Sequence, residues 1–147
     1  MSHKEIAREL FVKGYNCSQA VFAAFCDEMG MDMETALKLS SSFGAGMGRM
    51  REVCGACSGM FMVAGLLKAS ADCDDKSKAD HYKLIQDLAE KFKDKNNGTI
   101  ICREILKNLK PSTTPAPDKR TEEYYKARPC LKFVEEAVEI IDEMLEK

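Results

Sequence analysis

The sequence predicts an all-α protein, a single-domain bundle of six or seven helices around a central apolar helix. Apolar residues recur at helical spacing along most of the chain, and no stretch shows the sustained alternation of a half-buried strand. Residues that favour helix ends stand where these patterns begin and stop. The length of 147 residues and the apolar content of 45% suit one compact, cysteine-rich domain, residues 1–147.

Helix-capping residues define the first third of the chain. Ser2 and Glu5 have the spacing of a capping box, in which each side chain satisfies a free amide of the first turn. Asn16 and Asp32 can each cap a following helix, and Gly30 can stop the helix between them. The expected helices cover residues 2–13, 16–29 and 32–41.

The middle of the chain holds a glycine-rich loop, residues 43–51, followed by the segment expected at the centre of the fold. Residues 54–68 carry almost no polar surface, which is typical of a helix surrounded by other helices. Several small residues in this helix cost helix propensity, so we expect them to permit the close approach of another backbone or of a bulky group. These residues are Gly55, Ala56, Ser58, Gly59 and Gly65.

Three further helical patterns complete the predicted bundle, at residues 77–95, 99–109 and 129–145. The sequence Asn-Asn-Gly ends the first of them, and Pro129 stands at the start of the last. A proline-rich connection, residues 111–117, separates the second from the third. Because it is rigid and too short to be a linker between domains, we expect it to cross one end of the bundle.

Charge and hydropathy exclude two classes of function. The formal net charge is −2, without the basic excess that binding to nucleic acid requires. The longest uncharged run, residues 53–67, is shorter than the roughly 20 apolar residues that cross a bilayer, so no membrane insertion is expected. The first residues are charged and lack the apolar core of an export signal, and we therefore expect a cytoplasmic protein.

Seven cysteines are the most informative feature of the composition. Their number is odd and the expected compartment is reducing, so a framework of structural disulfides is disfavoured. Thiol chemistry, metal or cluster ligation and small buried apolar side chains remain open. Cys26 and Cys73 lie at no predicted helix start, and we interpret them as structural or incidental.

Four cysteines fall in the first turn of a predicted helix: Cys17, Cys54, Cys102 and Cys130. Free amides and the positive end of the helix dipole stabilise an anion there, and a cysteine at such a position can have a pKa well below the usual value of about 8.5. The pattern predicts one site built from four helix starts. The simpler alternative is that these positions only have room for a small residue.

The sequence Cys54-Gly-Ala-Cys57 is also a C-x-x-C motif. Three residues apart on a helix, the two sulfurs share a face and could form a reversible disulfide or supply two ligands to a metal. No strand precedes the motif, which argues against a thioredoxin fold, and the second C-x-x-C of a zinc ribbon is absent.

Taken together, these motifs resemble the family of redox-active proteins named for its C_GCAxxG_C_C cysteine pattern. The resemblance covers most of the chain. Its first, third and fourth cysteines match Cys17, Cys102 and Cys130, and the C-G-A-x-x-G element begins at Cys54. The glycine-rich segment that precedes this element also matches the family, at Gly44, Gly46, Gly48 and Arg49.

The resemblance implies a small soluble helical protein with a redox role that its cysteines carry. It extends to the iron–sulfur region of split-Soret cytochromes. No haem is expected here, because the chain has no C-x-x-C-H motif and only two histidines. Cys57 stands at a variable position of the motif, so a dithiol reaction through Cys54 and Cys57 would be particular to this sequence.

Two redox hypotheses stay open from the sequence. In the first, the four helix-start cysteines bind an iron–sulfur cluster or zinc. In the second, the chain is a thiol–disulfide enzyme or electron carrier with Cys54 as the nucleophile and Cys57 or Cys17 as the resolving thiol. A redox partner protein would complete that cycle, and a homodimer is compatible with either hypothesis.

The third hypothesis is a non-catalytic module that binds a small anionic ligand at the glycine-rich loop. Gly46 and Gly48 would let backbone amides approach the ligand, and Arg49, with Arg51 nearby, would supply planar donors. An ordinary turn with two solvated arginines is the simpler interpretation of these residues.

Overall fold

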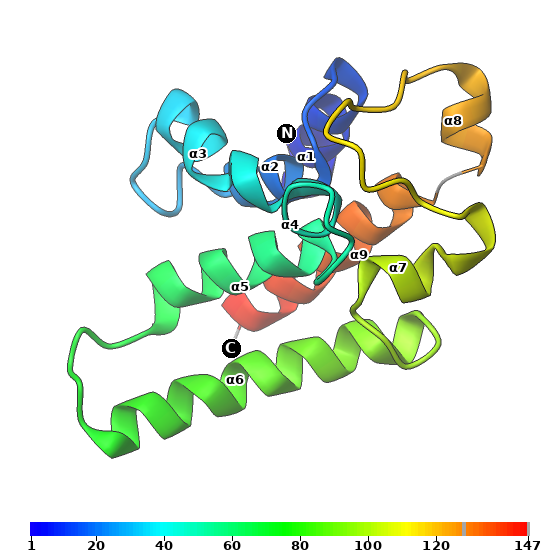
Figure 1. Cartoon of the computed structure of the whole chain (residues 1–147). Helices are drawn as coiled ribbons and strands as arrows, with labels where there is room; N and C mark the ends of the chain where they lie inside the picture. Colours follow the sequence, from blue (N-terminus) through cyan, green and yellow to red (C-terminus); the bar gives the residue numbers. More distant parts are fainter. Residues whose placement is uncertain (128, 147) are drawn as a thin grey trace.

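The computed structural model describes residues 1–127 and 129–146 (Figure 1). The described residues form seven α-helices of six residues or more and no strand beyond one isolated bridge, so the all-α prediction is confirmed. The longer helices are α1 (His3–Lys13), α2 (Cys17–Ala23), α3 (Met33–Ser40), α5 (Gly55–Lys68), α6 (Asp75–Lys95), α8 (Glu122–Ala127) and α9 (Cys130–Leu145). The short helical turns are η1 (Ser41–Phe43), α4 (Gly44–Met47), α7 (Cys102–Ile105) and η2 (Lys107–Leu109).

The predicted caps set the helix starts in the first third. The Ser2 hydroxyl accepts the Glu5 amide while the Glu5 carboxylate accepts the Ser2 amide, which completes the capping box. Asn16 caps α2 in the same reciprocal way with Gln19. Asp32 caps α3. Because these caps depend only on neighbouring residues, they can be predicted from local sequence.

Two helices share the middle of the bundle. α2 packs against α1, α3, α5 and α9, and its residues are buried apart from Cys17 and Gln19. α5 packs against α2, α6 and α9. The predicted central helix is therefore enclosed in its first part, up to Ala64, while Leu66 near its end is 52% exposed beside the exposed connection 69–74.

Small residues account for the close contact between α2 and α5. A Cβ atom added at Gly59 would lie 2.9 Å from the carbonyl oxygen of Ser18 and 3.0 Å from Cβ of Val21. The prediction of close approach is therefore correct at Gly59. It is wrong at Gly65, where nothing lies within 4 Å of the added atom.

The second helix is shorter than predicted. It ends at Ala23, after which the amides of Phe25 and Cys26 donate to carbonyls three residues earlier, at 3.2 and 3.1 Å. This tighter winding turns the chain while Phe25 stays fully buried. The apolar pattern that predicted a helix up to Met29 continues past the end of α2, because the residues after Ala23 are apolar for burial and not because they are helical.

None of the described helices combines the length and the apolar character that a membrane span needs.

A histidine links the N-terminus to the bundle. His3 lies between Glu28 and Asp142, with Nε2 2.6 Å from one carboxylate and Nδ1 2.7 Å from the other, and its ring stacks on Phe25 at 4.0 Å. Partial burial alone would lower the His3 pKa, but the hydrogen bonds and charges of the two carboxylates outweigh it and raise the pKa above its usual value. The protonated form therefore stabilises the fold below the unfolded pKa of about 6.5, and this contribution is lost as the pH rises through the higher folded pKa.

Replacing His3→Gln should lower the free energy of unfolding by about 1 kcal/mol at pH 6 and by clearly less at pH 9, because the charged pair exists only at the lower pH. Urea denaturation at the two pH values measures the difference. His81→Gln, which changes the other histidine, is the control. An equal loss at both pH values for His3→Gln would contradict the assignment.

Candidate functional site

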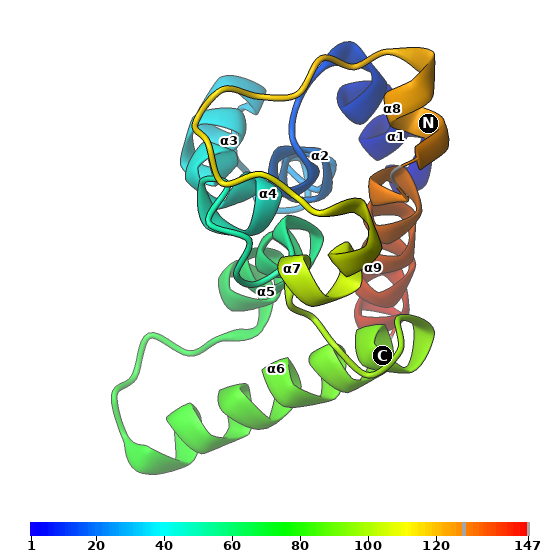
Figure 2. The same cartoon turned by 45° about the vertical axis from the view of Figure 1, so that its right-hand side comes forward.

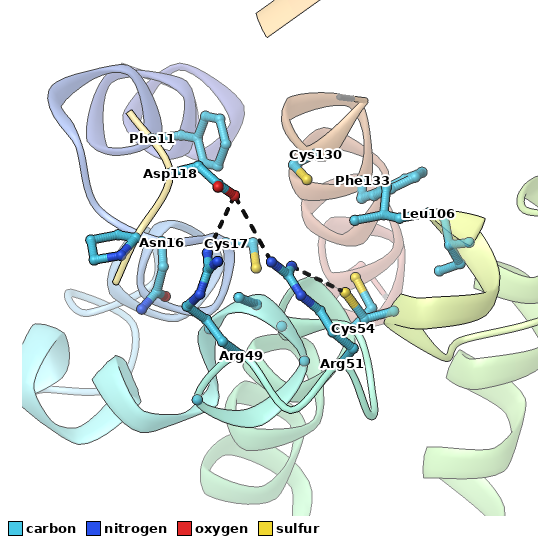
Figure 3. A pocket seen from close by; sticks show the side chains of 18 of the residues that line it. Phe11, Asn16, Cys17, Arg49, Arg51, Cys54, Leu106, Asp118, Cys130 and Phe133 are labelled. Atoms are coloured by element: carbon cyan, nitrogen blue, oxygen red, sulfur yellow. Dashed lines mark hydrogen bonds and ion pairs between the residues drawn. The ribbon is translucent and has the colours of Figure 1, made fainter. Parts of the chain in front are cut away.

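One pocket of about 280 Å³ brings together the four helix-start cysteines (Figure 3). Cys17 begins α2, Cys54 precedes α5, Cys102 begins α7 and Cys130 begins α9. Cys54 and Cys102 are buried, and Cys17 and Cys130 are partly exposed. The remaining wall is largely apolar and includes Phe11, Ile105, Leu106, Phe133, Pro115 and Pro117.

A backbone bridge fixes Cys54 and Cys102 beside each other. Val53 pairs with Ile101 in antiparallel orientation. The amide of Cys54 donates to the carbonyl of Ile100 at 2.7 Å, and the amide of Cys102 donates to the carbonyl of Glu52 at 2.6 Å. Two segments that are about 50 residues apart in sequence are thereby joined next to their cysteines.

The same bridge corrects a predicted helix boundary. The sequence predicts that a helix begins at Thr99, but the helix α7 begins at Cys102. Ile101 has extended backbone, with φ −91° and ψ 123°, and pairs with Val53. β-Branched side chains favour this conformation, and the tertiary contact decides between it and a helix.

Glycines make room for two of the cysteines. A Cβ atom at Gly55 would lie 2.4 Å from Sγ of Cys17, so only glycine lets α5 begin against this sulfur. A Cβ atom at Gly46 would lie 2.7 Å from Cβ of Cys102. The close approach predicted for Gly55 is therefore present, and its neighbour is a cysteine of the pocket.

The glycine-rich loop is a left-handed turn that lines the pocket. Every residue from 45 to 49 has positive φ, and so does Arg51. Ala45, Met47 and Arg49 have φ values of 53°, 70° and 68°, in a region that costs L-residues roughly 1–2 kcal/mol each. The expected ligand-binding residues Gly46, Gly48 and Arg49 all lie in the pocket wall. Such concentrated strain is typical of functional sites.

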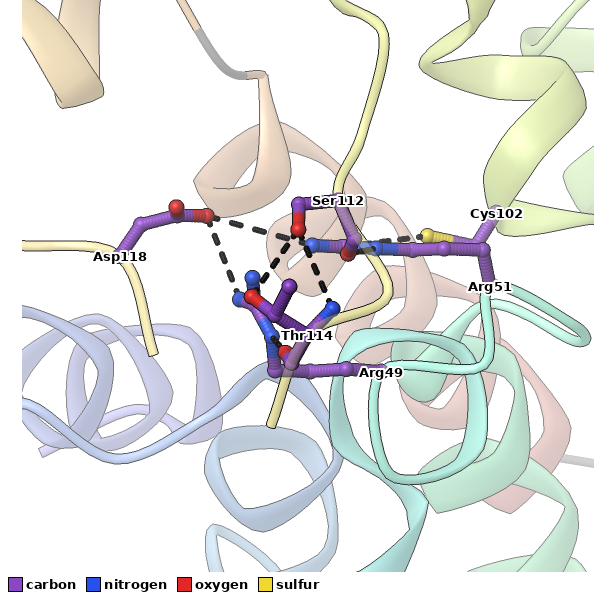
Figure 4. Close-up of polar contacts among 6 residues, drawn as sticks. All are labelled: Arg49, Arg51, Cys102, Ser112, Thr114 and Asp118. Atoms are coloured by element: carbon purple, nitrogen blue, oxygen red, sulfur yellow. Dashed lines mark hydrogen bonds and ion pairs between the residues drawn. The ribbon is translucent and has the colours of Figure 1, made fainter. Parts of the chain in front are cut away.

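The two arginines of this turn hold the proline-rich connection over the pocket (Figure 4). Arg49 Nε donates to the carbonyl of Thr114, and Arg51 Nε donates to the carbonyl of Ser112 at 2.9 Å. Asp118 lies 3.3 Å from Arg49 Nη1 and 3.9 Å from Arg51 Nη2. Figure 2 shows this connection running from α7 past α4 to α8, as expected for a segment that crosses one end of the bundle.

These contacts change the interpretation of the arginines. The side chains of Arg49 and Arg51 are only 11% and 3% exposed, so the expected turn with two solvated arginines is wrong. Both bind carbonyls of the chain itself, which leaves less donor capacity for a separate anionic ligand than the binding-module hypothesis assumes.

A third arginine ties the connection to the first helix. Arg120 donates to the carbonyls of Phe11 and Tyr15, and its guanidinium lies 4.2 Å from the centre of the Phe11 ring. Arg120 and Asp118 are not among the site residues that the sequence predicts. The only sequence feature that could identify these two residues is their charge after a proline-rich segment. Such charges are typical of any solvated loop.

Two thiols of the pocket, those of Cys17 and Cys54, have raised pKa values in this structure, contrary to the prediction from their helix-start positions. Burial raises the pKa of Cys17 to about 12, with a further contribution from Cys54, although the amides of Ala45 and Ser18 act in the opposite direction. A hydrogen bond with Cys57 and then burial raise the pKa of Cys54 well above its usual value. Loss of hydration therefore outweighs the local amides.

The other three cysteines lie outside the pocket wall. Cys57 is fully buried one turn into α5, next to Cys54. Cys26 is buried after α2 with its sulfur 3.9 Å from Asp27, and Cys73 is exposed in the connection before α6. Cys57 therefore contacts one of the four pocket cysteines, Cys54, without lining the pocket itself.

A zinc site and an iron–sulfur cluster require different spacings of the cysteine sulfurs. No three cysteine, histidine, aspartate or glutamate side chains in residues 1–127 and 129–146 are grouped closely enough to hold one metal ion. Tetrahedral zinc with bonds of about 2.3 Å requires sulfurs roughly 3.8 Å apart. In a cluster of four irons each thiolate binds a different iron atom, so the sulfurs stand further apart.

Substituting Gly55→Ala should destabilise the protein by about 1–3 kcal/mol, because the new methyl group overlaps the Cys17 sulfur and forces α2 and α5 apart. Gly65→Ala on the same helix meets no neighbour and should stabilise by about 0.5–1 kcal/mol through helix propensity. Chemical denaturation of both variants measures the contrast. Similar values for the two would show that Gly55 is not in contact with Cys17.

Comparison with known proteins gives one result. The family model described as "Putative redox-active protein (C_GCAxxG_C_C)" matches residues 15–144. Searches of the curated proteins and of the solved structures found no match. The matched region contains all four pocket cysteines and covers most of the chain. The chain therefore belongs to the C_GCAxxG_C_C family, which is described as redox-active.

Proposed function

We propose that this chain is an electron-transfer protein in which Cys17, Cys54, Cys102 and Cys130 bind an iron–sulfur cluster. The observation that carries the proposal is that these four cysteines, drawn from four separate segments, line a single pocket. Four thiolates are the usual ligand set of such clusters. When bound, the cluster supplies one-electron transfer, with one electron entering from a reduced partner protein and one leaving to an oxidised partner protein.

The geometry favours a cluster over zinc. The cysteines surround a cavity of about 280 Å³, which is far larger than one metal ion, and they are not grouped for a single ion within the described residues. Binding of the cluster would release the protons of Cys17 and Cys54, because both thiols have raised pKa values.

The pocket walls suit a negatively charged centre. Four thiolates together with the sulfides of a cluster bring net negative charge into a buried site, where charge is costly. Arg49, Arg51 and Arg120 place three positive charges in the wall against the one negative charge of Asp118, and the connection 111–118 covers the site. Burial and nearby donors are two of the means by which a protein sets a cluster's reduction potential.

Thiol–disulfide exchange is the second candidate, since Cys54 hydrogen-bonds with Cys57. The Cys54 thiolate would attack a partner disulfide and release one partner thiol. Cys57 would then displace the second thiol and leave a Cys54–Cys57 disulfide, so that two electrons pass to the partner. The raised pKa of Cys54 and the full burial of Cys57 give this reaction less support.

Anaerobic incubation of the purified chain with ferrous iron and sulfide should give a coloured protein that contains iron and sulfide together. Serine variants of Cys17, Cys54, Cys102 and Cys130 should each lower the bound iron severalfold, because each removes one ligand. Iron analysis and visible absorption provide the measurement. The matched controls are Cys26→Ser and Cys73→Ser, which lie outside the pocket wall and should retain the iron.

A colourless wild-type protein would contradict the proposal. If the protein takes up stoichiometric zinc and no iron, the four cysteines would be assigned to a zinc site and not to a cluster. If the wild-type protein binds no iron but reduces disulfides, and the Cys57→Ser variant loses this activity, the results would instead favour thiol–disulfide exchange.

A further inference from the structure

Arg51 is a buried cation in direct contact with a cysteine of the pocket. The residue is 3% exposed and lines the cavity. Its Nη1 atom donates to Sγ of Cys102 at 3.7 Å (Figure 4). A charge this deeply buried is costly unless anionic groups surround it.

One donor of this guanidinium is unsatisfied. Nε of Arg51 binds the carbonyl of Ser112, but Nη2 has no hydrogen-bond partner among the described residues. Oδ2 of Asp118 lies 3.9 Å from Nη2, beyond hydrogen-bond range. Leaving a buried donor without an acceptor is costly, so a site that keeps one indicates an acceptor in its functional state.

The backbone holds Arg51 in place at some cost. Its φ is 61°, in the left-handed region, and its Cα is so near Gly46 that a Cβ there would lie 2.6 Å away. The backbone amide of Arg103 donates to the carbonyl of Arg51 at 3.1 Å, and this bond remains when the Arg103 side chain, which donates to the same carbonyl at 3.3 Å, is replaced. Together with the bond to Ser112, these contacts fix the guanidinium beside Cys102.

We propose that Arg51 is a positioning residue that raises the reduction potential of the bound centre. This inference rests on the proposed function. Reduction adds one electron and therefore one negative charge to the pocket, without any other change in bonding. The fixed charge of Arg51 and its unpaired Nη2 donor stabilise that added charge more than they stabilise the oxidised state.

Arg103 is the matched control for this role. It follows Cys102 in the chain, but its side chain is 55% exposed and pairs with Glu52 at 2.8 Å. Removing its charge changes the net charge by the same amount as removing that of Arg51. Solvent and salt screen the exposed site, with a Debye length of about 8 Å at physiological ionic strength.

The test is a redox titration of the iron-loaded wild type, Arg51→Gln and Arg103→Gln, with electron paramagnetic resonance to verify that each holds the same centre. At a fixed potential, Arg51→Gln should lower the ratio of reduced to oxidised protein at least tenfold, or about 59 mV for a one-electron couple. Arg103→Gln should change the ratio less than twofold.

The inference is overturned if iron-loaded Arg51→Gln has a ratio of reduced to oxidised protein within twofold of that of Arg103→Gln. The proposed function would then stay intact. A wild-type protein that binds no iron overturns both. If Arg51→Gln fails to load, Asp118→Asn decides, because it keeps Arg51 and removes the carboxylate near Nη2. The ratio of reduced to oxidised protein in Asp118→Asn should rise severalfold above that of the wild type at the same potential. An unchanged or lower ratio overturns the inference.

Discussion

The close approach of α2 and α5 is the constraint on which the rest of the structure depends. At Gly59 the backbone of α2 leaves no room for a side chain, and at Gly55 the space is filled by the sulfur of Cys17. These contacts bring the start of α2 to the start of α5, where Cys54 lies. The two glycines of the C-G-A-x-x-G element thus act through packing: they set the distance at which the first two pocket cysteines face the same cavity.

The other half of the pocket depends on contacts between segments remote in sequence. The bridge between Val53 and Ile101 brings Cys102 to Cys54, and α9 presents Cys130 from the far end of the chain. The left-handed turn at residues 45–49 is strained, and the hydrogen bonds of Arg49 and Arg51 to the connection 111–118 offset part of that cost. The same two arginines therefore hold the connection over the pocket, and together with Arg120 they outnumber the single carboxylate of Asp118 in its wall, which supports a negatively charged centre inside it.

Local chemistry made much of the fold predictable from the sequence. The caps at Ser2, Asn16 and Asp32 act on neighbouring amides, and the helix start at Cys17 follows from the cap at Asn16. What could not be predicted depends on partners distant in the chain: the extended conformation at Ile101, the left-handed backbone of the glycine-rich turn and the burial of Arg51. The thiol pKa values belong to the second group, because a helix start favours thiolate only while water still reaches the sulfur.

The central claim is that four cysteines in one cavity act together as ligands of a multi-iron centre. X-ray absorption at the iron edge of the anaerobically loaded wild-type protein tests it most directly, since it reports the atoms around iron whether or not electrons are transferred. We expect a first shell of sulfur alone and a second shell that contains iron. A first shell of oxygen or nitrogen without an iron neighbour would contradict the claim, because the iron would then be bound outside the cysteine pocket.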